Sequence, residues 1–152
     1  MSIVTRLEHD ALLPDQELAA LVGRATGDGA VVSFTGIARP QSKDGDSVRQ
    51  LVLEHHPSLT LQSLQDIALD AAARFDVSHL HVVHRSGSIA PGEPVVFAGA
   101  ASLHRRAAFE AADYLMDRLK TEAVFWKREV GEEGSEWIEP TDADYADRDR
   151  WG

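Results

Sequence analysis

Apolar and polar positions along this chain follow two periods, and they predict strands and helices in mixed order. Residues 30–35 are apolar and β-branched, follow a turn at residues 27–29 and stop at Gly36, which indicates a buried strand. The polar stretch 41–47 is typical of a loop, and residues 48–54 then alternate imperfectly between apolar and polar. We therefore expect two strands that form a hairpin with a mobile tip.

Three segments carry apolar residues at helical spacing. Residues 14–24 form the first, and Pro57 opens the second, because a proline lacks an N–H that the first helical turn would leave unpaired. The third runs from about His104 to Lys120, with Ser102 as its expected cap. The apolar positions that define these helices are Leu18, Leu21 and Val22, then Leu61, Leu64, Ala68, Ala71 and Phe75, then Ala108, Ala111, Ala112, Leu115 and Leu119.

Two further pairs of strands are predicted in the second half of the chain. Residues 79–84 alternate, residues 95–101 are apolar, and a turn at Pro91-Gly92 lies between them. Residues 124–130 and 136–139 are short and rich in aromatic or β-branched side chains, and a glycine-bounded turn separates them. Three helices among about six to eight strands predict the α+β class. The 152 residues are expected to form one domain, 1–152, whose acidic tail from about residue 142 is loosely held.

Composition narrows the classes of function. The net charge of -10 argues against wrapping nucleic acid, because that affinity depends on a basic face. The first residues have no basic segment followed by an apolar one, and no apolar run approaches the roughly 18 residues of a membrane span, so we expect neither export nor a membrane anchor. The chain has no cysteine, which excludes a disulfide, a thiolate-bound zinc ion and a thiol nucleophile, and which fits the cytoplasm.

The few lysines of this chain are candidates for chemistry. Of fifteen basic residues only Lys43, Lys120 and Lys127 are lysines, and two of them flank residues 121–126. An arginine stays protonated, whereas a lysine that is desolvated or close to another cation can lose its proton and act as a nucleophile or base. The alternative is that Lys120 is a favourable cation at a helix C-terminus and Lys127 an exposed strand residue.

A second candidate is the junction of strand and helix at residues 102–106. The unpaired N–H groups of a first helical turn bind anions, Arg105 adds a bidentate donor, and His104 adds a hydrogen bond or a proton. A solvated first turn is the alternative. Arg39, at the end of a predicted strand, carries little weight by itself.

The histidines His79 and His81 lie two residues apart on one predicted strand. Such a pair can bind a metal ion, but no third ligand is obvious, so we expect an exposed or packed pair and no metal site.

Several motifs together resemble the large, catalytic subunits of molybdopterin synthases, the MoaE family. They run in order over residues 29–137, which is most of the chain. The motifs are residues 29–36 (GAVVSFTG) with Arg39, 53–57 (LEHHP), 83–87 (VHRSG) with Pro91-Gly92, 102–105 (SLHR) with Ala108-Phe109, 117–120 (DRLK), and 125–129 (FWKRE) with Trp137.

The resemblance implies an α/β hammerhead-like mixed sheet with an added β subdomain, and an enzyme that needs no cofactor. Its members form a homodimer that binds two small ubiquitin-like sulfur-carrier subunits, giving a heterotetramer. Each carrier ends in Gly-Gly with a thiocarboxylate. Sulfur passes from two carriers in turn to cyclic pyranopterin monophosphate, which forms the dithiolene of molybdopterin. A sulfur that arrives on the partner would explain why this chain has no cysteine.

The resemblance also implies roles for residues. Lys120 and Lys127 match the catalytic lysines, and both are expected to contact substrate. The further substrate-binding positions are Ile37, Ala38, Arg39, His104, Arg105, Arg128 and Glu129. Two departures are visible: many members carry a basic residue where Ile37 stands, and an arginine serving the neighbouring subunit can occur where this chain has Pro140-Thr141.

From these matches we expect Lys120 and Lys127 to lie in one pocket with His104 and Arg105. A non-catalytic adaptor that binds a ubiquitin-like tail or a phosphorylated ligand through the same basic site is the alternative function. A phosphate-transfer enzyme is disfavoured, because the chain has no glycine-rich phosphate loop and no cluster of metal-binding carboxylates.

Overall fold

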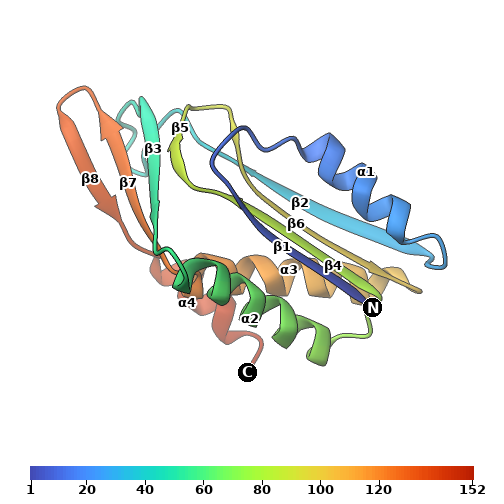
Figure 1. The fold of residues 1–152 in the computed structure, drawn as a ribbon. Coiled ribbons are helices and arrows are strands. Elements are labelled where there is room, and N and C mark those ends of the chain that lie inside the picture. Colours follow the sequence, from blue (N-terminus) through green and yellow to red (C-terminus); the bar gives the residue numbers. More distant parts are fainter.

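The computed structural model describes residues 1–152 as an α+β fold of four helices and two four-stranded sheets, which confirms the predicted class (Figure 1). The strands are β1 (Ser2–Glu8), β2 (Ala30–Ile37), β3 (Gln50–His55), β4 (His79–Arg85), β5 (Gly87–Ile89), β6 (Pro94–Ser102), β7 (Phe125–Gly131) and β8 (Gly134–Ile138). The helices are α1 (Pro14–Arg24), α2 (Leu59–Arg74), α3 (Arg105–Glu122) and α4 (Asp142–Asp149).

The first sheet has the order β1-β4-β6-β2. β4 pairs antiparallel with β6 as predicted, and β2 pairs antiparallel with the other edge of β6. The sequence patterns did not predict β1, which lies parallel to β4 with Ser2 opposite His79. This edge strand carries Arg6 and Glu8 among its apolar residues, so its alternation is weak. Its Ile3 and Leu7 nevertheless pack against the main core.

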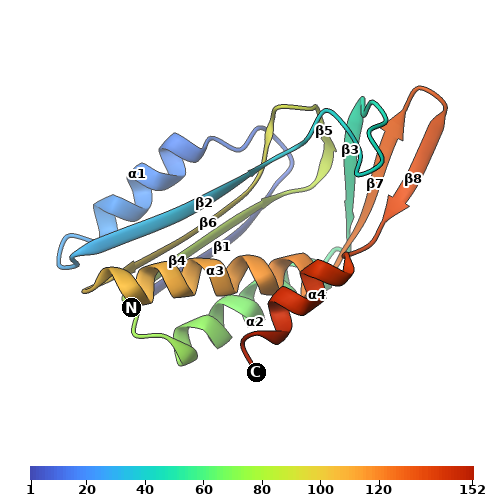
Figure 2. The ribbon, with the colours of Figure 1, turned by 180° about the vertical axis from the view of Figure 1, so that it is seen from behind.

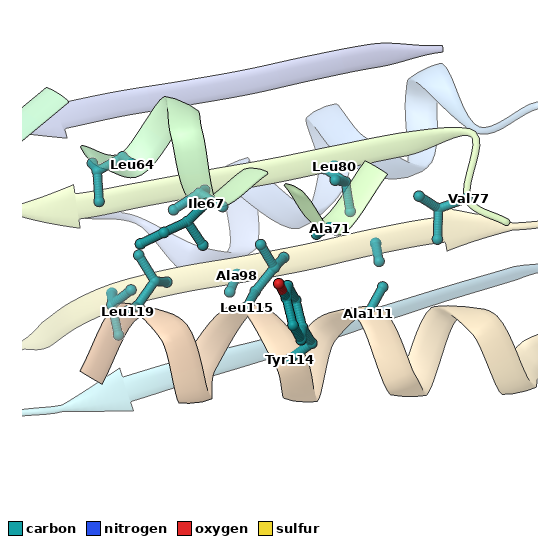
Figure 3. Packing of buried hydrophobic residues seen from close by; sticks show 13 residues of the cluster. Leu64, Ile67, Ala71, Val77, Leu80, Ala98, Ala111, Tyr114, Leu115 and Leu119 are labelled. Carbon is teal, nitrogen blue, oxygen red and sulfur yellow. The ribbon is translucent and has the colours of Figure 1, made fainter. Parts of the chain in front are cut away.

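The helices cover both faces of the first sheet, α1 on one and α2 with α3 on the other (Figure 2). The main core lies between the sheet and the α2–α3 layer, where Leu64, Ile67 and Leu115 are almost fully buried (Figure 3). On the opposite face α1 approaches the sheet so closely that a Cβ on Gly99 would lie 2.5 Å from Leu21 Cδ2. The helical periods predicted from sequence therefore mark the buried faces of α2 and α3 correctly, whereas of the three predicted positions on α1 only Leu21 is buried and Leu18 and Val22 are exposed.

The second sheet, of order β5-β3-β7-β8, stands beyond one end of the first (Figure 1). The predicted hairpin of residues 124–139 is confirmed as β7 and β8. The hairpin of β2 with β3 was wrong, because β3 pairs with β5 and β7 in this second sheet. Ala38 redirects the chain: its N–H donates to the Glu93 carbonyl and its own carbonyl accepts from Gly92 N–H. The segment that follows β2 thus passes from one sheet to the other.

The acidic tail also differs from the expectation of a loosely held segment, since it forms α4. Thr141 caps this helix, with Asp144 N–H donating to its hydroxyl and its own N–H donating to the Asp144 carboxylate. Trp151 follows the helix, and its indole N–H donates to Asp117 of α3 at 2.7 Å. A capping box and an aromatic anchor thus hold a segment whose composition alone suggests disorder.

Ser102 was also misplaced as a helix cap. It ends β6, and its hydroxyl accepts from His104 N–H at 3.1 Å, while His104 itself is the N-cap residue and makes no side-chain cap bond. None of the helices is long and apolar enough to cross a membrane.

Candidate active site

The two candidate lysines lie at the junction of α3 and β7. Lys120 is on the exposed last turn of α3, and Lys127 is the third residue of β7, where it is partly buried. Burial and, to a smaller extent, the Lys120 ammonium lower the pKa of the Lys127 amine to about 8, while Asp144 of α4 acts in the opposite direction. The two lysines are therefore electrostatic neighbours, as the sequence predicted.

His84 of β4 lies next to this pair. Its ring stacks on Phe125, two residues before Lys127, with 4.2 Å between the ring centroids and 29° between the planes. The pKa of the His84 imidazole is lowered to about 3, mainly by burial and also by the Lys127 charge, while the hydrogen bond to the Arg85 carbonyl acts in the opposite direction. A neutral imidazole therefore forms part of the surroundings of the Lys127 amine.

The strand end that carries Arg39 reaches the same region. Ala38 is buried against Leu53 of β3, and Leu53 is the cross-strand partner of Lys127. Ile37 and Arg39, on either side of Ala38, are exposed. The structure thus brings residues 37–39 close to the Lys127 strand pair and leaves the Arg39 guanidinium free to meet an anion.

The segment after Lys127 divides between two faces of the second sheet. Successive strand residues point to opposite faces, so Glu129 shares the face of Lys127 and Arg128 does not. Arg128 lies over the Trp137 ring, 5.8 Å from its centroid, and 3.9 Å from a Glu54 carboxylate oxygen. Within one chain Arg128 therefore lies on the opposite face of β7 from Lys127, and its contact with substrate stays a prediction.

His104 and Arg105 lie at the opposite end of α3 from Lys120. A rise of 1.5 Å per residue over the fifteen residues from Arg105 to Lys120 separates them by roughly 22 Å, so a single chain does not bring all four residues into one pocket. Both residues are exposed, and no side chain caps the first turn of α3. The backbone N–H groups of the first turn of α3 are therefore free to donate hydrogen bonds to an anion.

His79 and His81 belong to a separate polar network under α1. His81 Nε2 donates to Glu17 at 3.0 Å and its Nδ1 accepts from Arg24 at 2.8 Å, while His79 Nδ1 is 2.6 Å from the Ser2 hydroxyl. Burial lowers the pKa of His81. The structure contains no group of three or more histidine, aspartate and glutamate side chains arranged to hold a metal ion.

Sequence reasoning missed two residues of the lysine site, His84 and Asp144. His84 was visible only as part of the motif VHRSG, and its position at the α3–β7 junction depends on how the two sheets meet. Asp144 is one of several acidic residues in the tail, and only the fold of α4 distinguishes it from the others.

Comparisons with known proteins identify relatives of this chain. Residues 7–122 match the family model described as MoaE protein. A relative from Pseudomonas aeruginosa, named molybdopterin synthase catalytic subunit, is 45% identical over 146 residues, covering 96% of this chain and 97% of its own.

Two solved structures share the fold. The molybdopterin cofactor biosynthesis protein E from Burkholderia multivorans superimposes with a TM-score of 0.83 at 33% identity, covering 100% of this chain and 98% of its own. A structure of molybdopterin synthase from Staphylococcus aureus gives a TM-score of 0.76 at 27% identity, covering 90% and 94%. The match of the family model over most of the chain, together with these relatives, shows that the chain belongs to the MoaE protein family.

Proposed function

We propose that this chain is the catalytic subunit of a molybdopterin synthase. It transfers sulfur from the thiocarboxylated C-terminus of a small ubiquitin-like carrier to cyclic pyranopterin monophosphate, and this forms the dithiolene of molybdopterin. The observation that carries the proposal is the Lys120–Lys127 pair, in which burial and a like charge lower the pKa of Lys127. The relatives named molybdopterin synthase catalytic subunit support the same reaction.

The two lysines suit different tasks in such a transfer. With a pKa of about 8, Lys127 has roughly a tenth of its amine unprotonated at neutral pH, enough to take up and return a proton. The exposed Lys120 ammonium can attract the thiocarboxylate or the phosphate and stabilise charge that develops during transfer. No thiol of this chain is required, because it has no cysteine and the sulfur arrives on the carrier.

A second copy of the chain completes the site in this proposal. The edge strand β2 exposes Phe34 by 44% and Ile37 by 57%, and the start of α3 exposes Leu103 and Phe109. Exposed apolar residues beside an unpaired strand edge favour association of two copies. A partner that covers them would bring its own His104 and Arg105 to the lysines, which the length of α3 prevents within one chain.

Single-turnover sulfur transfer tests the proposal. The chain is mixed with thiocarboxylated carrier and cyclic pyranopterin monophosphate, and the dithiolene product is followed for the wild type and for Lys120→Ala, with Lys43→Ala as a matched control. We expect product with the wild type and with the control, and nearly none with Lys120→Ala. Tight carrier binding without product in the wild type would favour the adaptor function.

The proposed reaction also has an expected compartment. We place the reaction in the cytoplasm, in keeping with a chain that has no cysteine to form a disulfide.

A further inference from the structure

Arg85 is a buried arginine in the motif VHRSG to which the proposed reaction assigns no task. It ends β4 of the first sheet, and after a single residue, Ser86, the chain begins β5 of the second sheet. Its side chain is only 6% exposed, and its Nε has no hydrogen-bond partner in the chain. A buried ion pair is often no more stabilising than an apolar replacement, so the contacts of this arginine indicate what else it does.

The guanidinium of Arg85 binds three segments of the chain. Its Nη1 donates to the Glu93 carboxylate at 3.3 Å, and its Nη2 donates to the carbonyl oxygens of His9 at 3.1 Å and Ser88 at 3.2 Å. His9 follows β1, Ser88 lies in β5, and Glu93 precedes β6. A guanidinium is planar and presents its donors in a fixed arrangement, so it holds these three segments in one geometry where the two sheets meet.

Glu93 binds this guanidinium from a tight turn. One of its carboxylate oxygens pairs with Arg85, and the other accepts from the Ala90 N–H at 2.9 Å. The Glu93 N–H also donates to the Ala90 carbonyl, at 3.1 Å, which closes the turn. Because the Glu93 side chain is 41% exposed, water weakens the attraction between the charges, and the pair acts chiefly by fixing where the turn lies.

The same turn holds the strand end that carries Arg39. The Ala38 N–H donates to the Glu93 carbonyl at 2.9 Å, and the Gly92 N–H donates to the Ala38 carbonyl at 2.8 Å. Pro40 restricts the backbone of Arg39 to extended conformations, so the position of Ala38 sets the direction in which the Arg39 side chain leaves the backbone. That side chain is exposed, and its placement therefore depends on the turn.

The second sheet is fixed to the same guanidinium. Ile89, which follows the Ser88 carbonyl that Arg85 binds, packs in one apolar cluster with Leu53. Leu53 lies opposite Lys127 in the pairing of β3 with β7. One buried guanidinium therefore lies between the two segments that carry candidate site residues, the end of β2 and the strand β7.

We propose that Arg85 is a positioning residue for Arg39. Through Glu93 it holds the backbone of Ala38 in place. It thereby sets where the Arg39 guanidinium stands relative to the Lys127 amine. This inference rests on the proposed function and on the expected contact of Arg39 with the substrate.

Amide hydrogen exchange tests the link between the turn and Ala38 without substrate. Glu93→Gln keeps an oxygen for the Ala90 N–H and replaces the oxygen that pairs with Arg85 by an NH2 group, which cannot accept. We expect the Ala38 amide to exchange about ten times faster in this variant, because the turn that carries its acceptor opens more often.

Glu8→Gln on β1 is the matched control. It removes a comparable contact, that of the Glu8 carboxylate with the Arg6 Nε at 2.7 Å, from a side chain that is 30% exposed. The Ala38 amide should exchange at the wild-type rate in this control.

Equal exchange of the Ala38 amide in wild type and in folded Glu93→Gln overturns the proposal. If Glu93→Gln does not fold, Arg85→Gln removes the charge from the other partner, and the same criterion applies. If neither variant folds, the pair is needed for the fold itself and the positioning role is refuted.

The kinetics of sulfur transfer give a second readout. At saturating thiocarboxylated carrier we expect Glu93→Gln to raise the KM for cyclic pyranopterin monophosphate about tenfold and to change kcat little, since a displaced binding group weakens ground state and transition state alike. In an Arg39→Ala background the same substitution should have almost no further effect, because the side chain that it displaces is absent. A loss of stability alone would instead lower activity by a similar factor in both backgrounds.

An effect of Glu93→Gln on KM that persists in full in the Arg39→Ala background overturns the positioning role, even where amide exchange has changed. The exchange measurements need no substrate, so a wild type that transfers no sulfur would refute the proposed function alone.

Discussion

Replacing Lys120 by methionine would separate the two causes of the low pKa of Lys127. Together, burial and the Lys120 charge bring this pKa from 10.5 to about 8, and burial is the larger cause. The methionine side chain would keep much of the volume of Lys120 and remove the charge. Because the smaller share belongs to Lys120, we expect the pKa of Lys127 to rise by about one unit and to stay below its ordinary value.

The expected rise has a consequence for chemistry at neutral pH. A rise of one unit reduces the unprotonated fraction of Lys127 about tenfold, from roughly a tenth to roughly a hundredth. Lysine NMR of the variant, which retains only Lys43 and Lys127, would measure the change without ambiguity. Added salt should raise the pKa in the wild type and have less effect in the variant, because the exposed Lys120 charge is screened.

Two results would refute this reasoning. A Lys127 pKa that does not change in Lys120→Met would mean that the like charge has no influence. A return to the ordinary value of 10.5 would mean that burial has none. In either case the electrostatic link between the lysines, added to burial, could not account for the low pKa.

The remaining predictions concern the carboxylate beside Lys127, the core and acid stability. Asp144→Asn, which keeps an oxygen for the Thr141 N–H, should lower the pKa of Lys127 further in the same NMR titration; an unchanged value would show that α4 is electrostatically irrelevant. Leu115→Ala should cost about 2–5 kcal/mol in chemical denaturation because the side chain is fully buried, whereas a similar loss for the exposed Leu69→Ala would contradict the packing described here. The pKa of His81 is lower in the folded than in the unfolded state, so its contribution to stability is present above about 6.5 and is lost as the pH falls below it. Unfolding curves of the wild type should show this loss, and His81→Gln should show a shallower dependence over the same range.

Sequence patterns predicted correctly the elements whose bounds depend on residues close together in the chain. The helix Pro14–Arg24 begins at a proline in its first turn and carries Leu18, Leu21 and Val22 at helical spacing, and it was predicted to the residue. The hairpin of β2 with β3 failed because neighbouring strands in the sequence were assumed to pair. The chain instead leaves the first sheet at Ala38, whose backbone hydrogen bonds with residues 92 and 93 cannot be read from the sequence.

The candidate site was predicted only in part, because some of its residues are close in the sequence and others come from distant elements. The preference for arginine elsewhere in the chain singled out Lys120 and Lys127, and the short connection between α3 and β7 ensures that they are neighbours. The length of the intervening helix, which the sequence motifs do not convey, separates His104 and Arg105 from the lysines of the same chain. The positions of His84 and Asp144 depend on contacts between elements distant in the sequence, and no local pattern carries that information.

The length of α3 has a genetic consequence. If the lysines at one end of the helix work with His104 and Arg105 from the other chain of a symmetric pair, a chain defective at Lys120 and a chain defective at His104 are each inactive with their own kind. Mixed dimers of the two would contain one doubly defective site and one fully intact site. Two inactive alleles would then restore activity when expressed together, and the spacing set by this rigid helix would be the cause of their complementation.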